Sequence, residues 1–147
     1  MRLFQTIDIS ASGLTAERVR MDLISNNIAN AHTTRTETGE PYRRQIAVFT
    51  ERPAKSRFQV PGTPLTDRIG NGVRVAAIQE DLQSAFKRVY DPSHPDADEY
   101  GYVLFPNIEP VKEMVDMITA TRAYEANSTV ITSTSRMINR ALEIGSR

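Results

Sequence analysis

Carboxylates and an imidazole gather in one polar stretch of the sequence, and such groups can bind a metal ion or move protons. In chain order the stretch holds Asp91, His94, Asp96, Asp98 and Glu99. Its Asp-Ala-Asp spacing before Gly101 resembles the start of a calcium loop, but Asn107 stands where the closing bidentate Glu is needed. Two prolines and Asp side chains that bond to nearby backbone favour a solvated turn. We therefore expect no metal site.

Catalytic patterns are missing elsewhere in the sequence. The two histidines, His32 and His94, stand beside turn formers in distant parts of the chain, and no nucleophile elbow or dinucleotide sequence accompanies them. The turn 70–72, Gly-Asn-Gly, is not followed by a helix that starts with Lys and Ser or Thr, so it is not a phosphate-binding loop. We expect neither an enzyme nor a bound cofactor, and no small-molecule substrate.

Composition narrows the classes of partner. The chain of 147 residues has 18 basic and 18 acidic side chains, which argues against nucleic acid as a partner. It contains no cysteine, so thiol chemistry and disulfides are excluded while the compartment stays open. The N-terminal apolar residues are interrupted by polar ones, unlike a cleaved signal peptide, and no apolar run is long enough to span a bilayer.

The polar stretch precedes a segment that predicts one long helix. No proline or glycine occurs between Val111 and Ile144, and Pro110 suits a first helical turn. Two apolar rows recur every seven residues: Ala123, Val130, Met137 and Ile144, and Met117, Tyr124, Ile131 and Ile138. A small or polar row lies between them: Ala120, Asn127, Thr134 and Ala141. Such a face suits the close approach of another helix. A helix of about 50 Å is longer than a domain of this size can cover, so part of this face must contact another partner.

The N-terminal segment has a matching period. Between Leu3 and Asn30 a single row recurs every seven residues: Ile7, Leu14, Met21 and Ile28. Gly13 interrupts the segment at a cost of about 1 kcal/mol in a helix interior. This narrow stripe indicates half of an interface with the C-terminal helix. Asn26, Asn27 and Asn30 then indicate a helix end that leads into turns.

Three polar residues on the C-terminal helix allow two interpretations each. Asn127 either lies at the rim of the seam or sets the register between helices. Arg122 and Glu125 are either solvated or pair across subunits.

The middle of the chain predicts a small β region of three to five strands. Strand-like stretches run over 42–51, 73–78, 85–90 and 100–105, with a loop over 52–66 and a hairpin turn at 70–72 that joins 68–69 to 73–78. The expected fold is mainly α, with a short antiparallel β insert between paired terminal helices. Its expected parts are 1–34, 35–106 and 107–147.

Two terminal motifs carry a family resemblance. The run from Ser10 to Thr34, with Asn-Asn-Ile-Ala-Asn at 26–30, resembles the signature of the axial proteins of the bacterial flagellum. The run from Glu113 to Asn127 is similar to the matching C-terminal signature of rod, hook and hook-associated proteins. The short insert and the stretch from Tyr90 to Met114 resemble the short basal-body rod proteins.

The resemblance implies a structural subunit of the cell-proximal rod. Such a rod is a drive shaft across the periplasm, links the membrane ring to the hook and surrounds the export channel. The implied partners are further copies, other proximal and distal rod proteins, a ring-to-rod adaptor, and the type III apparatus that exports the chain without a cleaved signal. The terminal arms are expected to order on assembly. Heptads alone also permit a soluble coiled-coil adaptor.

The rows lead to a packing hypothesis. Leu14, Met21 and Ile28 are expected to pack on the Ala123 and Tyr124 rows of the C-terminal helix. Torque would then pass between subunits through contacts between helices.

Overall fold

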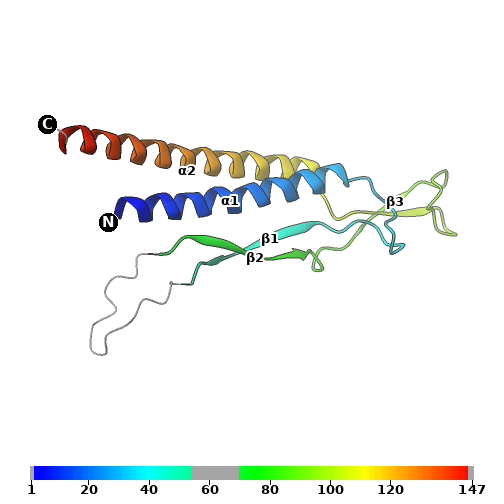
Figure 1. Cartoon of the computed structure of the whole chain (residues 1–147). Coiled ribbons are helices and arrows are strands. Elements are labelled where there is room, and N and C mark those ends of the chain that lie inside the picture. The colour runs from blue at the N-terminus through cyan, green and yellow to red at the C-terminus, as the bar shows by residue number, and fades with distance from the viewer. Residues whose placement is uncertain (1, 54–69, 146–147) are drawn as a thin grey trace, which may run out of the picture.

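The chain forms an elongated molecule in which two long antiparallel helices run side by side (Figure 1). The computed structural model describes residues 2–53 and 70–145. In chain order the elements are α1 (Arg2–Ala29), β1 (Gln45–Glu51), β2 (Val73–Glu80), β3 (Lys87–Tyr90), β4 (Tyr102–Phe105) and α2 (Pro110–Gly145). This arrangement confirms the predicted fold class. Within the described ranges, neither helix is long and apolar enough to cross a bilayer.

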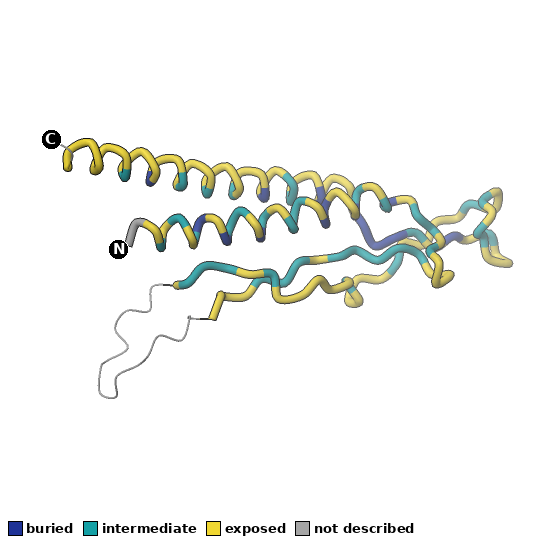
Figure 2. Tube along the Cα trace, in the orientation of Figure 1, coloured by how far each residue is buried: buried dark blue, intermediate teal, exposed yellow. Residues whose placement is uncertain are grey.

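Helix α2 forms as its sequence predicts, and its small and polar row is the most buried part of it. Ala120 is 0% exposed and Thr134 is 2% exposed, while the last member of the row, Ala141, is exposed. The reason is length: α2 has 36 residues against 28 in α1, so its C-terminal turns extend past the N-terminus of α1 (Figure 2). Small side chains along the buried row let the two helices approach closely.

Helix α1 lies between α2 and the β1–β2 ribbon (Figure 1). Its buried apolar side chains, Ala16, Leu23 and Ile24, are not members of the predicted heptad row. The heptad row predicted from the sequence assumed that α1 contacts only one other helix. Because α1 is covered by α2 and by the ribbon, its buried residues are distributed over a wider arc.

Gly13 is explained by this close approach. A Cβ atom added at Gly13 would lie 3.0 Å from the amide nitrogen of Asn127 on α2. Glycine at this position therefore lowers the helix propensity but leaves the space that the Asn127 side chain occupies.

Strands β1 and β2 form an antiparallel ribbon in which Gln45 faces Glu80 and Glu51 faces Val73, with an irregularity between Val48 and Phe49. The described partner of β2 is therefore β1, whereas the sequence had predicted pairing with 68–69 across a turn at 70–72. Residues 68–69 lie outside the described residues, as does most of the predicted loop 52–66. Gly72 has a φ of +94°, and a Cβ atom there would collide with the Ser12 hydroxyl of α1. The Ser12 hydroxyl accepts a 3.0 Å hydrogen bond from the backbone N–H of Val73, which fixes the ribbon on α1.

Strands β3 and β4 form a second hairpin at the far end of the molecule (Figure 1). They begin two residues later than the sequence predicted, at 87 and 102 instead of 85 and 100. For β4 the cause is the Asp98 carboxylate, which accepts hydrogen bonds from the backbone N–H groups of Tyr100 and Tyr102 and holds the residues between them in a turn. The first predicted strand also begins late, at Gln45 instead of residue 42, because the backbone N–H of Arg44 donates to the Asn107 side chain and not to a neighbouring strand.

Candidate assembly interface and its polar junction

Asn27 joins both helices to the ribbon, and its side chain is 1% exposed. Its amide nitrogen donates to the backbone oxygen of Gln45 at 2.9 Å and to the Glu113 carboxylate at 3.1 Å. Its amide oxygen accepts from the backbone N–H of Gln45 at 2.9 Å and from the Tyr42 hydroxyl at 3.2 Å. The amide thus pairs with both backbone groups of one β1 residue, Gln45, as a residue of a neighbouring strand would. Both donor hydrogens and both acceptor positions of the amide are therefore used.

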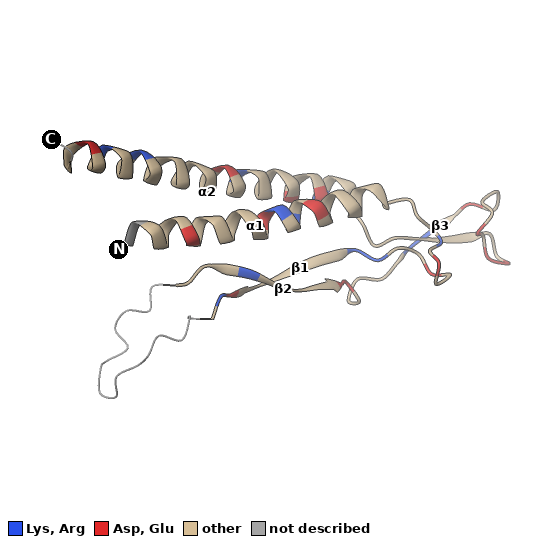
Figure 3. Ribbon diagram, viewed as in Figure 1, with Lys and Arg blue, Asp and Glu red and all other residues tan. Residues whose placement is uncertain are grey.

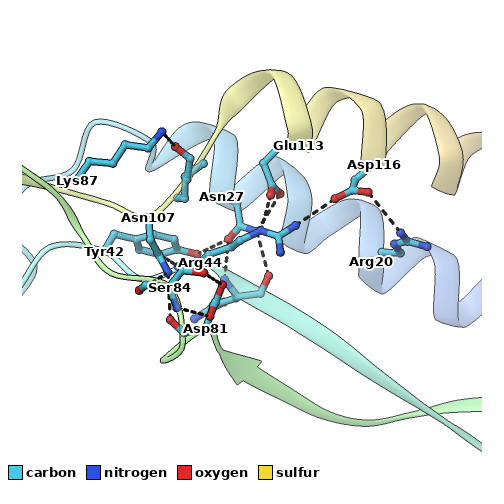
Figure 4. Close-up of polar contacts among 12 residues, drawn as sticks. Arg20, Asn27, Tyr42, Arg44, Asp81, Ser84, Lys87, Asn107, Glu113 and Asp116 are labelled. Atoms are coloured by element: carbon cyan, nitrogen blue, oxygen red, sulfur yellow. Dashed lines mark hydrogen bonds and ion pairs between the residues drawn. The ribbon is translucent and has the colours of Figure 1, made fainter.

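Glu113, in the first turn of α2, is a fully buried carboxylate at 0% exposure. The guanidinium of Arg44 donates to Glu113 and, at 3.1 Å, to Asp116 (Figure 4). Asp116 also lies 3.8 Å from the guanidinium of Arg20 on α1. A buried carboxylate is tolerated only when it is paired and hydrogen-bonded, and Glu113 meets both conditions.

Loops from the β region close the same junction. The Asn107 amide accepts from the backbone N–H of Arg44 at 3.0 Å and donates to the backbone oxygens of Asp81 and Ser84. The ammonium group of Lys87 donates to the backbone oxygen of Ile108 at 2.9 Å. Residues 81–87 and 107–108 are therefore tied to the start of α2. We call the set Asn27, Arg44, Asn107, Glu113 and Asp116 the polar junction.

The electrostatic environment of the junction shows in Tyr42. Burial raises the pKa of the Tyr42 hydroxyl, and the negative charges of Glu80 and Glu113 raise it further. The neutral hydroxyl is therefore retained, and it serves as a donor to Asn27.

The three asparagines of the N-terminal motif have different positions. Asn26 is exposed, whereas Asn30 is half-buried. The amide of Asn30 donates to the backbone oxygen of Asn26 at 3.0 Å and accepts from the Thr33 hydroxyl, so it closes the end of α1. Asn27 alone of these three enters the polar junction.

The heptad residues singled out from the sequence lie along the seam between the helices and at its rim. Half-buried positions are Ile7, Leu14, Met21 and Ile28 on α1 and Met117, Ala123, Ile131 and Ile138 on α2. Tyr124, Val130 and Met137 are 36%, 40% and 54% exposed. The Ala123 row thus turns its later members outward, because the small row occupies the centre of the seam.

Asn127 is half-buried beside Gly13, and its amide donates to the backbone oxygen of Ala123 in its own helix at 2.9 Å. Arg122 and Glu125 are exposed.

Two features were missed by the sequence interpretation. The first is the ion pair between Glu113 and Arg44, whose only sequence signal is a Glu at the base of an apolar seam. The second is an exposed apolar group at the start of α2, where Val111, Met114, Val115 and Ile118 are 70%, 51%, 57% and 54% exposed. Their spacing of three and four residues places them on one helix face, and this face is not the one formed by the heptad rows.

The acidic loop uses its carboxylates to close turns. Asp91 accepts from the backbone N–H and the hydroxyl of Ser93, and those bonds lower the pKa of Asp91. Asp96 accepts a 2.8 Å hydrogen bond from the Thr34 hydroxyl and lies 3.7 Å from the Arg35 guanidinium. His94 accepts from the backbone N–H of Asp96. The bonds of Asp91 and His94 to nearby backbone N–H groups are of the turn type expected from the sequence, whereas Asp96 joins the loop to residues 34–35.

Two family models match the two ends of the chain, and known proteins match nearly its whole length. The family model "Flagella basal body rod protein" matches residues 7–35, and the model "Flagellar basal body rod FlgEFG protein C-terminal" matches residues 100–144. The flagellar basal-body rod protein FlgC of Borreliella burgdorferi is 52% identical over 98% of each chain. The FlgC proteins of Bacillus subtilis and Salmonella typhimurium are 46% and 36% identical, each over 99% of both chains. The chain therefore belongs to the family of flagellar basal-body rod proteins, which are structural subunits of the rod.

Proposed function

We propose that this rod subunit polymerises through its terminal helices in the cell-proximal part of the rod. The observation that carries the proposal is the exposed apolar surface of α2, which includes Val111, Val115 and Ile118. No described part of the same chain covers these side chains. In a subunit of a polymer, such surface is buried by neighbouring subunits.

The polymer would work as a drive shaft that passes torque from the membrane ring to the hook and surrounds the export channel. Its stiffness depends on many helix contacts that repeat along the rod, and each contact requires a fixed geometry within the subunit. The polar junction supports that requirement, because it joins α1, α2 and the ribbon through buried bonds. The role is mechanical, and we assign no catalytic activity and no cofactor.

The family implies assembly with other rod components. We infer that these are the other proximal and distal rod proteins and the ring-to-rod adaptor, and that the type III apparatus delivers the chain to the periplasm without a cleaved signal. Ordering of the terminal helices on assembly agrees with this route, because the export channel passes unfolded chains. We also assign 1–34 and 107–147 to an inner helical domain and 35–106 to the insert.

Fractionation tests the proposal against a soluble coiled-coil adaptor. The chain is expected to co-purify with basal bodies stripped of their filaments. Recovery of the chain only in the soluble fraction, from cells with complete basal bodies, would contradict a role in the rod.

A further inference from the structure

One face of α1 stays uncovered along the whole helix. Its residues alternate between steps of four and three, the spacing of a coiled-coil seam. We define the α1 outer face by these exposed residues: Phe4, Asp8, Ala11, Thr15, Arg18, Asp22, Ser25 and Ala29. Small side chains predominate between the charges, which permits close approach of a second helix. Three of its members are charged, and in the described part of the chain none of these three makes an ion pair.

Helix α2 has a matching uncovered face. We define the α2 outer face by these exposed residues: Val115, Ile118, Arg122, Glu125, Thr129, Ser133 and Arg136. It includes two of the exposed apolar side chains and continues into alternating charges. Within the described ranges Arg122, Glu125 and Arg136 also lack an ion pair. Figure 3 shows that charges of both signs occur along each helix.

The charges of the two outer faces are complementary in one antiparallel alignment. When Asp22 is set opposite Arg122, Arg18 lies within one residue of the position opposite Glu125. The same alignment brings Asp8 opposite Arg136, Thr15 opposite Thr129 and Ala29 opposite Val115. Every charged member of the α1 outer face thereby meets the opposite charge.

Neighbouring alignments lose this match. A shift by one helical turn in one direction sets Arg18 against Arg122, and a shift in the other direction sets Asp22 against Glu125. Like charges that face each other across a helix interface are destabilising, so the charge pattern selects a single register. A parallel alignment that joins Asp22 to Arg122 sets Arg18 against Ile118 and keeps only the one pair.

The alignment also fits the geometry of a polymer. Two copies that point in the same direction present α1 and α2 antiparallel to each other, as they are inside one chain. Within the chain Asn27 lies against Glu113 and Gly13 against Asn127. The alignment between outer faces is displaced by four residues from that internal register, which is an axial step of about 6 Å at 1.5 Å per residue.

We propose that the α1 outer face of one copy packs antiparallel on the α2 outer face of the next copy, held in register by Asp22 with Arg122, Arg18 with Glu125 and Asp8 with Arg136. The contact joins two different surfaces, so each copy keeps one free surface of each kind and the chain of contacts continues. The proposal rests on the proposed function and specifies which surface of a second copy covers the exposed face of α2.

Charge exchange tests the register. Asp22→Arg alone and Arg122→Asp alone each place like charges at the contact, and each is expected to lower the amount of chain recovered in basal bodies several-fold. The double variant restores an opposite pair and is expected to recover to within about twofold of the unmodified chain. Glu37→Arg, at an exposed turn, is the matched control and is expected to have no effect. A double variant at least as defective as the worse single variant would overturn the pairing.

Cysteine cross-linking tests the contact directly, because the chain has no cysteine of its own. Thr15→Cys and Thr129→Cys, combined in one chain, are expected to form disulfide-linked ladders in isolated basal bodies. Ala11→Cys with Thr129→Cys is one turn out of register and is expected to cross-link at least about fivefold less. Equal cross-linking of the two pairs, or none by either, would overturn the packing.

The failure of this packing is distinguishable from the failure of the proposed function. If the cysteine variants are present in basal bodies but do not cross-link, a different surface or a different rod protein covers α2 and only the packing is rejected. If the unmodified chain is itself absent from basal bodies, the proposed function fails as well.

Discussion

Two neighbouring residues of identical type have opposite environments in this protein. Asn26 is exposed, whereas Asn27 is 1% exposed and makes four hydrogen bonds in the polar junction. A step of one residue rotates a side chain by about 100° around a helix, so only one of the two can face the ribbon and α2. An amide at position 27 is required because it must both donate to and accept from the backbone of Gln45.

The first prediction concerns that amide. Asn27→Asp replaces the donor to the Gln45 backbone oxygen with an acceptor and places a second carboxylate beside the buried Glu113. We expect a loss of about 3–5 kcal/mol in the stability of the assembled subunit, the range for a broken buried pair. The measurement is the urea concentration that releases the chain from isolated basal bodies.

Asn26→Asp is the control for this variant, since it makes the same chemical change one residue away at an exposed position. It is expected to shift the release by less than about 0.5 kcal/mol. Equal effects of the two substitutions would contradict the role assigned to the Asn27 amide.

Polar side chains that pack beside glycines or bond to backbone groups hold the elements of this fold together. Along α1, Gly13 accommodates Asn127 of α2, and Ser12 bonds to the backbone N–H of Val73 where Gly72 leaves room. Such contacts tolerate little sliding, because each needs a hydrogen-bond partner and an open space at the same height. They fix α1 relative to two different elements.

The second prediction tests the spacing between α1 and α2. Gly13→Ala adds up to about 1 kcal/mol of helix propensity, but its Cβ atom would lie 3.0 Å from the Asn127 amide. We expect the contact to dominate, so that Gly13→Ala reduces swimming in soft agar. The double variant Gly13→Ala with Asn127→Ala removes the crowding and is expected to swim better than Gly13→Ala alone. A double variant no better than the single one would show that the Asn127 side chain does not set this distance.

The third prediction concerns the β3–β4 hairpin and pH. Hydrogen bonds from the backbone N–H groups of Tyr102 and Tyr100, together with the Arg88 charge, lower the pKa of the Asp98 carboxyl below its ordinary value of 3.8. Because the pKa is lower in the folded state, the ionised carboxylate stabilises the turn at pH values above the ordinary pKa. This contribution is lost as the pH falls through the folded-state pKa. We therefore expect the Tyr102 amide proton, followed by NMR, to lose its hydrogen-bonded shift and its protection from exchange below about pH 4.

Asp98→Asn provides the comparison for the pH experiment, because it removes the titrating group. The Tyr102 amide in this variant is expected to show no transition in the same acid range. A transition of unchanged size would assign the effect to another carboxyl group.

At the scale of the whole molecule, the helices are long and the surface that covers them is small. Val130, Met137 and Ile144 remain 40%, 54% and 78% exposed, although they belong to one heptad row. In a rod these side chains are expected to lie between subunits.

The fourth prediction tests this row. Val130→Asp places an unpaired charge where a neighbouring subunit is expected to pack, and it should block rod assembly while the β insert stays folded. Val130→Thr keeps the shape without the charge and is expected to assemble. Normal motility of the Val130→Asp strain would count against packing at this position.

The fifth prediction concerns the isolated chain. Far-UV circular dichroism of the purified monomer is expected to show less helix than the structure contains, since the exposed rows gain partners only in the rod. A rigid monomer with the full helix content of α1 and α2 would refute ordering on assembly.

The sequence by itself determined the elements, because their causes are local. The absence of proline and glycine from Val111 to Ile144 fixes α2, and the seven-residue rows identify the helices as partners. The motifs at 26–30 and 113–127 led to the family, which the relatives confirm. Strand starts were displaced by two or three residues. The backbone N–H of Arg44 bonds to Asn107, 63 positions away, and the Asp98 carboxylate closes a turn within the stretch that had been predicted as strand.

Only the tertiary structure decided which side chains meet. The four partners of Asn27 come from Tyr42, Gln45 and Glu113, and Glu113 is 86 positions away in the sequence. A heptad pattern records contact with one neighbour, whereas α1 has two within the chain, so its buried residues were not those of the predicted row. Burial depends on which surfaces share one space, and the sequence pattern of a single helix does not contain that information.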